Sequence, residues 1–328
     1  MTPAERSRSW RKSGPRALIA IGAILAVGGA IVSVIVVFAS PAAPDERQAK
    51  AAGGSLVWGD EFHGPAGAGP DRRKWGLETG HGWGDGELQA YTERRANASL
   101  DGKGRLRITA RRERFTHPDG FTSRYTSARL TTQHKLELAY GRIEARIRVP
   151  AGRGLLPQFW ALGNNLDSAG WPASGEIDVM EVNGAKPRLL SGTLHGPRRG
   201  HKDFAVGGER RTAAPLSNGF HVYGVRWSPS RIAFTFDGEV YAVRTPAHLP
   251  SGARWRFNHP FFFLLTLPVG GNWLGRPDAT TQMPATMLVD WIRVRSTGRA
   301  TFCAIVRARE FRKRCPQRPR GAAEGRGE

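Results

Sequence analysis

Short apolar runs separated by turn residues recur along most of this chain and are its strongest structural signal. Each run is rich in Val, Ile, Leu and aromatic residues and is bounded by Gly, Pro, Asn or Asp, as β-strands are. No long amphipathic helix interrupts the series. The pattern predicts a two-sheet antiparallel sandwich, in which one face of each strand is core and the other faces solvent or a cleft. The clearest runs are 106–110, 140–150, 220–227, 232–238, 259–267 and 287–295.

One large β domain can account for most of the 328 residues, 40% of which are hydrophobic. The 41 glycines and 22 prolines follow no fixed period, which fits many strands joined by many turns and excludes a collagen-like chain. We therefore assign residues 56–296 to a single all-β domain.

The first 55 residues predict a membrane anchor and a linker. Residues 17–39 contain 23 positions without a charge and follow the basic segment 1–16, which would stay cytoplasmic. Residues 40–55 have the Pro, Ala, Gly and charge content of a linker. We expect a signal anchor in the cell membrane that holds the domain outside. Cleavage before Ser40 is the alternative and would give a secreted protein.

Positive charge is spread over the whole chain. Of the net charge of +21, residues 1–16 hold +4 and residues 299–328 hold +6, so the middle keeps +11. This charge suits an anionic wall polymer, a lipid surface or nucleic acid, and equally a solvated arginine-rich surface. The sequence has no recognition helix, RNP-like strand or zinc spacing, so we expect no nucleic-acid partner.

The basic C-terminal tail, residues 297–328, holds both cysteines of the chain, Cys303 and Cys315. In an exported protein they could close a disulfide, and otherwise they would remain free thiols.

Three acids stand within six positions of one strand-like segment, Gly-Glu-Ile-Asp-Val-Met-Glu. In a regular strand Glu176 and Asp178 point to one face and Glu181 to the other. One extra residue, a β-bulge near Val179 or Met180, would return Glu181 to the face of the other two acids. Bulges of this kind are frequent beside active sites.

Carboxylates that share one face repel one another unless they share protons or their pKa values are pushed apart. Retaining glycosidases need an ionised carboxylate as nucleophile and a protonated acid about 5–5.5 Å away. A third acid between them can hold a proton and tune both. The motif therefore favours glycoside hydrolysis, while a solvated acidic strand or a metal site stays open on spacing alone.

Aromatic residues and a histidine surround the acids in the sequence. Trp160 and Trp171 lie upstream, and flat indoles suit the apolar faces of sugar rings. His195 follows on what we expect to be the adjacent strand. Taken singly, each would more commonly be a core or structural residue.

Several stretches accompany the acid motif in a fixed order: WGDEF at 58–62, GWGDGELQAYT at 82–92, YTSARLTT at 125–132, YGRIEARIRVP at 140–150, WPASGEIDVMEVNG at 171–184, GTLHGP at 192–197 and VGGNWLG at 269–275. With them the chain resembles glycoside hydrolase family 16 over residues 56–296, in particular its laminarinase-like branch of bacterial endo-β-1,3-glucanases. The resemblance implies a concanavalin A-like β-jelly roll with a concave substrate cleft. It also implies a monomeric enzyme that cleaves β-1,3 or mixed β-1,3/1,4 glucans and requires no cofactor.

By this resemblance Glu176 is the nucleophile, Asp178 its assisting acid and Glu181 the general acid/base. The resemblance also places six side chains against glucose units or the acids: Asn97, Arg129, Trp160, Trp171, His195 and Trp273. A structural calcium on the convex side would be held by Glu61, the backbone of Gly104 and Asp290.

Two residues depart from the family pattern, and two other functions stay open. Leu156 stands where the family commonly has Trp, and Pro268 lies in a strand-like run where proline suits an edge or a bulge.

The same chemistry could act on a galactan or another β-linked wall polymer. A non-catalytic carbohydrate-binding protein would be expected to lack one of the acids, and all three are present.

The predicted anchor can be tested by fractionating cells that produce the full-length chain. Because 23 uncharged residues are long enough to span a bilayer, the protein should stay with membranes after a high-salt wash. A soluble extracellular form that starts near Ser40 would contradict the anchor and support cleavage.

Overall fold

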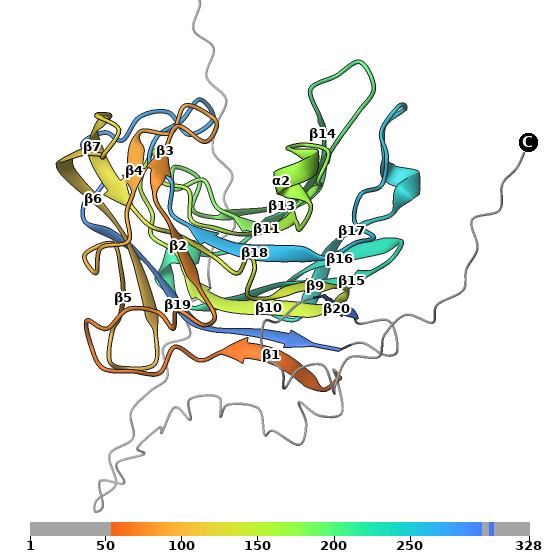
Figure 1. The fold of residues 1–328 in the computed structure, drawn as a ribbon, viewed down its shortest axis with the longest axis horizontal. Coiled ribbons are helices and arrows are strands. Elements are labelled where there is room, and N and C mark those ends of the chain that lie inside the picture. Colours follow the sequence, from red (N-terminus) through yellow and green to blue (C-terminus); the bar gives the residue numbers. More distant parts are fainter. Residues whose placement is uncertain (1–53, 297–301, 305–328) are drawn as a thin grey trace, which may run out of the picture. The chain divides into compact units, whose positions relative to one another are not determined.

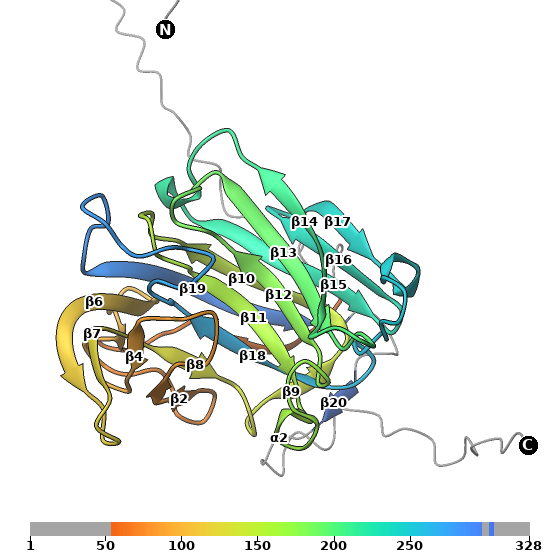
Figure 2. The same cartoon turned by 90° about the horizontal axis from the view of Figure 1, so that it is seen from above.

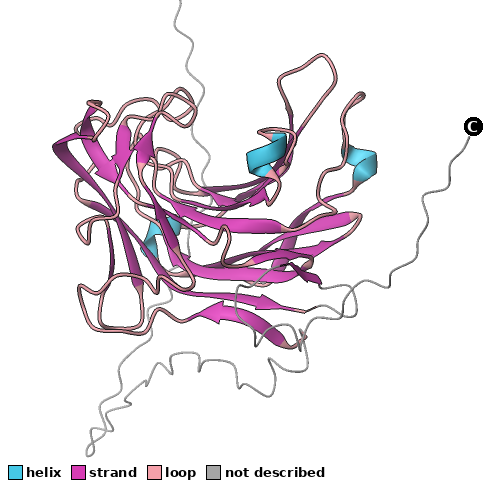
Figure 3. Ribbon diagram, in the orientation of Figure 1, coloured by secondary structure: helices cyan, strands magenta, loops and turns pink. Residues whose placement is uncertain are grey.

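Alternating buried and exposed side chains place the strands in two sheets that pack face to face, which confirms the predicted sandwich (Figures 1 and 3). The computed structural model describes residues 54–296 and 302–304. On β13 (Leu189–Gly196), Leu190 and Leu194 are fully buried, whereas Ser191 and His195 are partly exposed. This two-residue period gives the sheet one core face and one open face.

The first sheet has eleven strands in the order β17-β16-β15-β10-β19-β6-β7-β4-β3, with β1 beside β19 and β5 beside β6. Its pairs are antiparallel except for β4 with β7. The strands are β1 (Leu56–Asp60), β3 (Gly80–His81), β4 (Gln89–Tyr91), β5 (Ala98–Leu100), β6 (Leu106–Thr116), β7 (Thr122–Ser127), β10 (Gly141–Arg148), β15 (His221–Ser228), β16 (Arg231–Phe236), β17 (Glu239–Arg244) and β19 (Ala285–Arg295).

The second sheet has nine strands and carries the acid motif. Its order is β14-β13-β12-β11-β18-β8-β2, with β9 beside β18 and β20 beside β9. Figure 2 shows β14, β13, β12, β11 and β18 side by side. Besides β13, its strands are β2 (Gly76–Glu78), β8 (Arg129–Thr131), β9 (Glu137–Ala139), β11 (Gln158–Gly163), β12 (Glu176–Glu181), β14 (Phe204–Arg211), β18 (Phe261–Thr266) and β20 (Phe302–Ala304).

Helical structure is limited to short turns between the described strands. They are α2 (Leu166–Ala169) and two 3-10 turns, η1 (Leu216–Asn218) and η2 (Pro246–His248). The β-sheets therefore position the side chains of the open face.

Large apolar side chains from both sheets fill the space between them. Phe159 and Ile177 from the second sheet, and Val225 and Ile292 from the first, are almost completely buried in one continuous core. Burying a side chain of this size contributes about 1.5–3 kcal/mol. The second sheet is thus fixed from behind, and its other face is free to carry polar groups.

The two ends of the domain meet at the edge of the first sheet. The amide of Ser296 donates to the carbonyl of Ser55, 2.9 Å away, and their hydroxyls lie 3.0 Å apart.

The segment assigned to a tail contributes a strand of its own, which the sequence did not predict. Phe302–Ala304 forms β20 and pairs with β9, with Cys303 opposite Leu138. Three residues are too short to give a periodic signal, and the free edge of β9 supplies the pairing. Cys315 lies outside the described residues, so the Cys303–Cys315 disulfide stays a prediction.

Neither departure from the family pattern interrupts the sheet. β18 ends at Thr266, so Pro268 lies beyond the strand, and its carbonyl accepts the amide of Leu156 at 3.2 Å. The Leu156 side chain is buried.

No helix in the described part of the chain is long and apolar enough to cross a membrane. The predicted cytoplasmic segment 1–16 and the anchor 17–39 lie outside the described residues, as does most of the linker 40–55.

Candidate active site

Strand β12 contains the extra residue that the sequence predicts. Against β11, Asp178 pairs with Trp160 and Met180 pairs with Phe159, so Val179 has no partner. The register against β13 also shifts between Asp178 and Glu181. Val179 and Met180 both remain in the core, so the bulge leaves no gap behind the strand. The predicted bulge is confirmed.

The bulge brings all three acids to the open face of the sheet. Their partners on β13 are spaced two residues apart: Glu176 pairs with His195, Asp178 with Thr193 and Glu181 with Ser191. Because residues two apart share a face of a strand, these partners all point away from the core. His195 lies on the adjacent strand, as predicted.

Glu176 and Glu181 are partly exposed, and each accepts a different hydrogen bond. The indole Nε1 of Trp171 donates to Glu176 Oε2 at 2.6 Å. The amide Nε2 of Gln158 donates to Glu181 Oε1 at 2.9 Å. Fixed donors of this kind hold each carboxylate in one orientation.

A relay of neutral groups orients the amide that faces Glu181. Trp160 Nε1 donates to Thr266 Oγ1 at 3.0 Å, and Thr266 Oγ1 donates to Gln158 Oε1 at 2.9 Å. Since its carbonyl oxygen is occupied in this way, Gln158 must present its NH2 group to Glu181. Trp160 therefore acts on the acids through two other side chains.

Asp178 is the most deeply buried of the three acids, with 1% of its surface exposed. His195 Nε2 lies 3.3 Å from its Oδ2, and His195 Nδ1 lies 3.1 Å from Asp203 Oδ2. Among the described residues no amide, hydroxyl or ring N–H is aligned to donate to either oxygen of Asp178, and its side-chain hydrogen-bond partner is the carboxyl group of Glu176. One carboxylate oxygen of Glu176, one of Asp178 and one ring nitrogen of His195 all lie within 4.8 Å of one another. A buried carboxyl group in this position is satisfied if it shares a proton with Glu176 through a hydrogen bond.

Burial raises the pKa of all three carboxyl groups. The charge of Asp178 raises the pKa of Glu176 further, and the charge of Glu181 does the same for Asp178. The amide of Gln158 partly opposes the effect on Glu181. The cluster therefore retains protons at pH values where isolated carboxyl groups have lost them, as acid/base chemistry requires.

Arg129 lies between two aromatic rings on the same face. Its guanidinium carbon is 4.9 Å from the centre of the Trp83 ring and 4.7 Å from that of Trp160, and its Nε donates to Glu78. Trp83 also stacks on Tyr91 at 5.4 Å. The structure thus places Arg129 and Trp160 together, and their contact with sugar stays a prediction.

Exposed indoles stand at both ends of the row of acids. Trp171 is 41% exposed and binds Glu176, whereas Trp273 is 51% exposed and its backbone amide donates to Asp85 Oδ2 at 3.2 Å. The charge of Asp85 contributes to the raised pKa of Glu181, so this second loop belongs to the Glu181 end. Both tryptophans are accessible, as sugar-binding platforms must be.

The prediction that Asn97 contacts substrate is wrong in this structure. Asn97 is fully buried, its Nδ2 donates to the carbonyl of Thr109 at 2.9 Å, and its Oδ1 accepts the hydroxyl of Thr92 at 2.6 Å. Arg94 also donates to Oδ1 at 3.1 Å. Because its polar atoms are occupied inside the protein, Asn97 supports the turn before β5 and has no free group for a sugar.

The residues predicted to hold calcium do not fit that role here. Arg293 donates to both oxygens of Glu61, at 2.8 and 3.0 Å, and Arg146 donates to Asp290 at 2.5 Å. Gly104 lies beside the backbone carbonyl of Glu61, and no group of three or more His, Cys, Asp or Glu side chains gathers around these residues in the described chain. Two arginines already neutralise the carboxylates that a cation would need.

Three residues at the site were not singled out from the sequence. Gln158 carries no charge and matches no motif by itself, and Asp203 lies in a loop before β14. Trp83 stood inside a quoted stretch, and the alternating glycines around it were the available signal of a tightly turned loop.

Comparison with known proteins decides the family. The sequence profile described as Glycosyl hydrolases family 16 matches residues 87–293. The chain belongs to glycosyl hydrolase family 16. A β-glucanase from Rhodothermus marinus is 37% identical over 258 residues, which cover 76% of this chain and 87% of that protein.

Solved structures of family 16 share the fold. An endo-β-1,3-glucanase from Pyrococcus furiosus gives a TM-score of 0.68 at 41% identity and covers 74% of this chain and 94% of its own. The laminarinase catalytic domain from Thermotoga maritima gives 0.68 at 40% identity, with 74% and 98% covered. The chain is thus a glycoside hydrolase with the jelly-roll sandwich of family 16, and hydrolysis by carboxyl groups uses no organic cofactor.

The buried acid should make the folded protein less stable as pH rises. The pKa of Asp178 is raised above its ordinary 3.8 in the folded state, so its stabilising contribution is present below that value and is lost as pH rises through the folded pKa. The neutral Asp178→Asn variant escapes this loss. Urea unfolding at pH 8 should show it to be more stable than the wild type, and the difference should shrink as pH falls toward 4.

A matched control is Asp167→Asn, because the side chain of Asp167 is 70% exposed. That variant should unfold like the wild type. If Asp178→Asn were less stable than the wild type at every pH from about 5 to 9, the assignment of a raised pKa would be wrong.

Proposed function

We propose that this family 16 enzyme is a retaining endo-β-1,3-glucanase acting on laminarin-like or mixed β-1,3/1,4 glucans. The observation that carries the proposal is the row of acids on β12. The bulge at Val179 aligns Glu176, Asp178 and Glu181 on the open face and gives each a different set of partners. The glucanase relatives support the choice of substrate.

In the proposed first step Glu176 attacks the anomeric carbon while Glu181 protonates the leaving oxygen. A glycosyl ester on Glu176 results. In the second step Glu181 takes a proton from water, and the hydroxide displaces Glu176 from the same carbon. Two inversions retain the configuration. Trp171 and Gln158 keep the two carboxyl groups in position throughout.

Asp178 acts as a proton holder in this proposal. It is more deeply buried than Glu176, and the two carboxyl groups share a hydrogen bond that holds one proton between them. When the proton lies on Asp178, its O–H group donates a hydrogen bond to Glu176, and Glu176 is then ionised for attack. His195 is paired with Asp203 and lies 3.3 Å from Asp178 Oδ2, so it limits how far the Asp178 carboxyl can turn.

Exposed indoles support binding of a chain longer than the reacting sugar. Trp171 stands at the Glu176 end of the row, and Trp273 stands in the loop tied to Asp85 at the Glu181 end. Platforms on both sides of the scissile bond suit an endo-acting enzyme, whose substrate passes across the whole open face as in a concave cleft.

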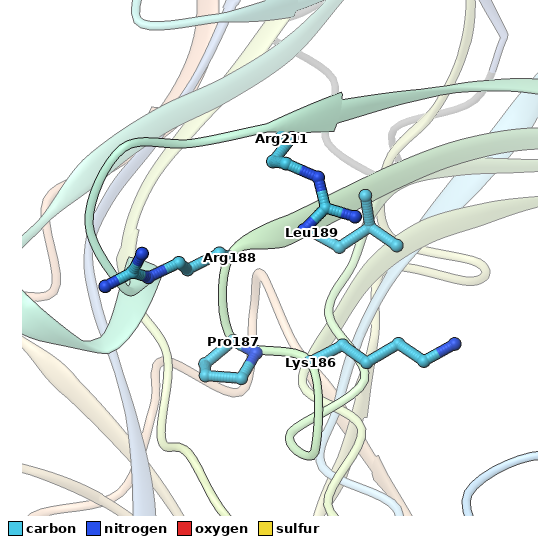
Figure 4. Close-up of a pocket in the computed structure, with 5 residues that line it drawn as sticks. All are labelled: Lys186, Pro187, Arg188, Leu189 and Arg211. Carbon is cyan, nitrogen blue, oxygen red and sulfur yellow. The ribbon is translucent and has the colours of Figure 1, made fainter. Parts of the chain in front are cut away.

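We further propose that the domain works outside the cell as a monomer, held to the membrane by residues 17–39. Basic groups would aid retention on anionic wall polymers. One cluster of basic side chains lines a pocket at the start of β13 and the end of β14. The pocket is lined by Lys186, Arg188 and Arg211 together with Pro187 and Leu189 (Figure 4). Charge away from the reacting bond affects encounter more than the choice of bond.

The proposed substrate is tested by incubating the full-length chain with laminarin, lichenan, agarose and xyloglucan and identifying the products. Laminarin should give a series of internal oligosaccharides from the first minutes, and Glu176→Gln should give none. Products from agarose without products from laminarin would favour the galactan alternative. If the folded protein released no product from any of the four polysaccharides, the glucanase proposal would be refuted.

A further inference from the structure

Two histidines and an aspartate meet on the first sheet, whereas the catalytic acids lie on the second. His81 ends the short strand β3, while His117 and Asp119 lie in the turn between β6 and β7. The turn is closed by backbone hydrogen bonds from His117 to Phe121 and from Gly120 to His117, at 2.8 and 2.9 Å. Segments about forty residues apart in the sequence thus present their side chains to one another.

The three side chains converge on a small volume. Asp119 Oδ2 lies 2.8 Å from His81 Nε2, and Asp119 Oδ1 lies 3.1 Å from His117 Nδ1. One ligand atom from each residue lies within 4.8 Å of the other two. Both imidazoles are mostly covered, with 24% and 17% of their side chains exposed, whereas the side chain of Asp119 is 53% exposed.

The surroundings fix the orientation of these groups. The His81 ring stacks on Phe121 with ring centres 3.7 Å apart, and the amide of Phe121 donates to Asp119 Oδ1 at 3.0 Å. His117 Nδ1 is buried, and the carboxylate oxygen of Asp119 that lies 3.1 Å away is poorly aligned with it for a hydrogen bond. A buried ring nitrogen without a partner costs free energy unless another group satisfies it.

Two imidazole nitrogens and a carboxylate oxygen are the donor set that zinc-type ions prefer, whereas calcium prefers oxygen atoms alone. Tetrahedral ligands about 2.0–2.1 Å from zinc are separated by about 3.3 Å. The observed 2.8 and 3.1 Å separations are short of this by a few tenths of an ångström. Asp119 is 53% exposed on a turn and can move by that amount.

We propose that His81, His117 and Asp119 bind a divalent transition-metal ion of the zinc type, with a fourth position left to water. The ion satisfies the poorly paired nitrogen of His117 and fastens the turn between β6 and β7 to β3. This site shares no residue with Glu61, Gly104 and Asp290, and it does not depend on the proposed glucanase activity.

The position of this site connects it to the loop that carries Trp83. Trp83 follows His81 by two residues, and its indole packs over Gly80, where a Cβ would lie 2.4 Å from the ring. The same loop carries Asp85, which holds Trp273. An ion on His81 therefore fixes the start of the segment that positions both indoles.

Zinc binding by the full-length chain, measured by isothermal titration calorimetry with zinc chloride alone, tests the proposal. Cobalt(II) serves as a spectroscopic substitute whose visible absorption reports imidazole ligands in a four-coordinate site. The wild type should bind one zinc ion that Asp119→Asn and His117→Ala bind at least about tenfold more weakly. The visible absorption of bound cobalt should be lost in the same two variants.

His134→Ala is the matched control, because His134 also has acidic neighbours but its side chain is 70% exposed. It should bind zinc like the wild type. Asp119→Asn nearly preserves shape, and its melting without metal shows whether the variant is folded. Wild-type affinity in a folded Asp119→Asn or His117→Ala variant would overturn the proposal, as would the absence of saturable binding by the wild type up to about 1 mM zinc.

Discussion

The cost of placing three carboxyl groups together on one β-strand governs the arrangement of the open face. Each group loses water there, and each negative charge raises the free energy of the next. The second sheet meets this cost with an extra residue at Val179, which aligns the acids, and with a separate partner for each one. Behind the strand the core stays continuous, so the polar arrangement is supported by ordinary apolar packing.

The neighbours of the acids determine how their protons are divided. Trp171 stabilises charge on Glu176, Gln158 presents an amide to Glu181, and Asp178 lies between the carboxyl group of Glu176 and the imidazole of His195. Two of these partners come from outside β12, on β11 and in the loop that precedes the motif. The catalytic geometry therefore belongs to the sheet as a whole, and the relay through Thr266 extends it to β18.

Local patterns in the sequence were sufficient for the longer strands, for the bulge and for His195 beside the acids, because each follows from periodicity over a few residues. Contacts between distant segments were not predictable in the same way. Glu61 meets Arg293 across 232 positions, so its carboxylate could not be excluded as a calcium ligand from the motif alone. Asn97 was misassigned because burial of a polar side chain depends on neighbours that only the fold brings together.

The most direct test of the account is the stereochemistry of azide rescue on an activated aryl β-glycoside. In Glu176→Ala, azide should replace the missing nucleophile and give the inverted α-glycosyl azide. In Glu181→Ala the ester on Glu176 still forms, since the leaving group needs little protonation, and azide should then give the retained β-glycosyl azide. NMR of the products distinguishes the two. An inverted product from Glu181→Ala, with a retained product from Glu176→Ala, would contradict the assignment of the two roles.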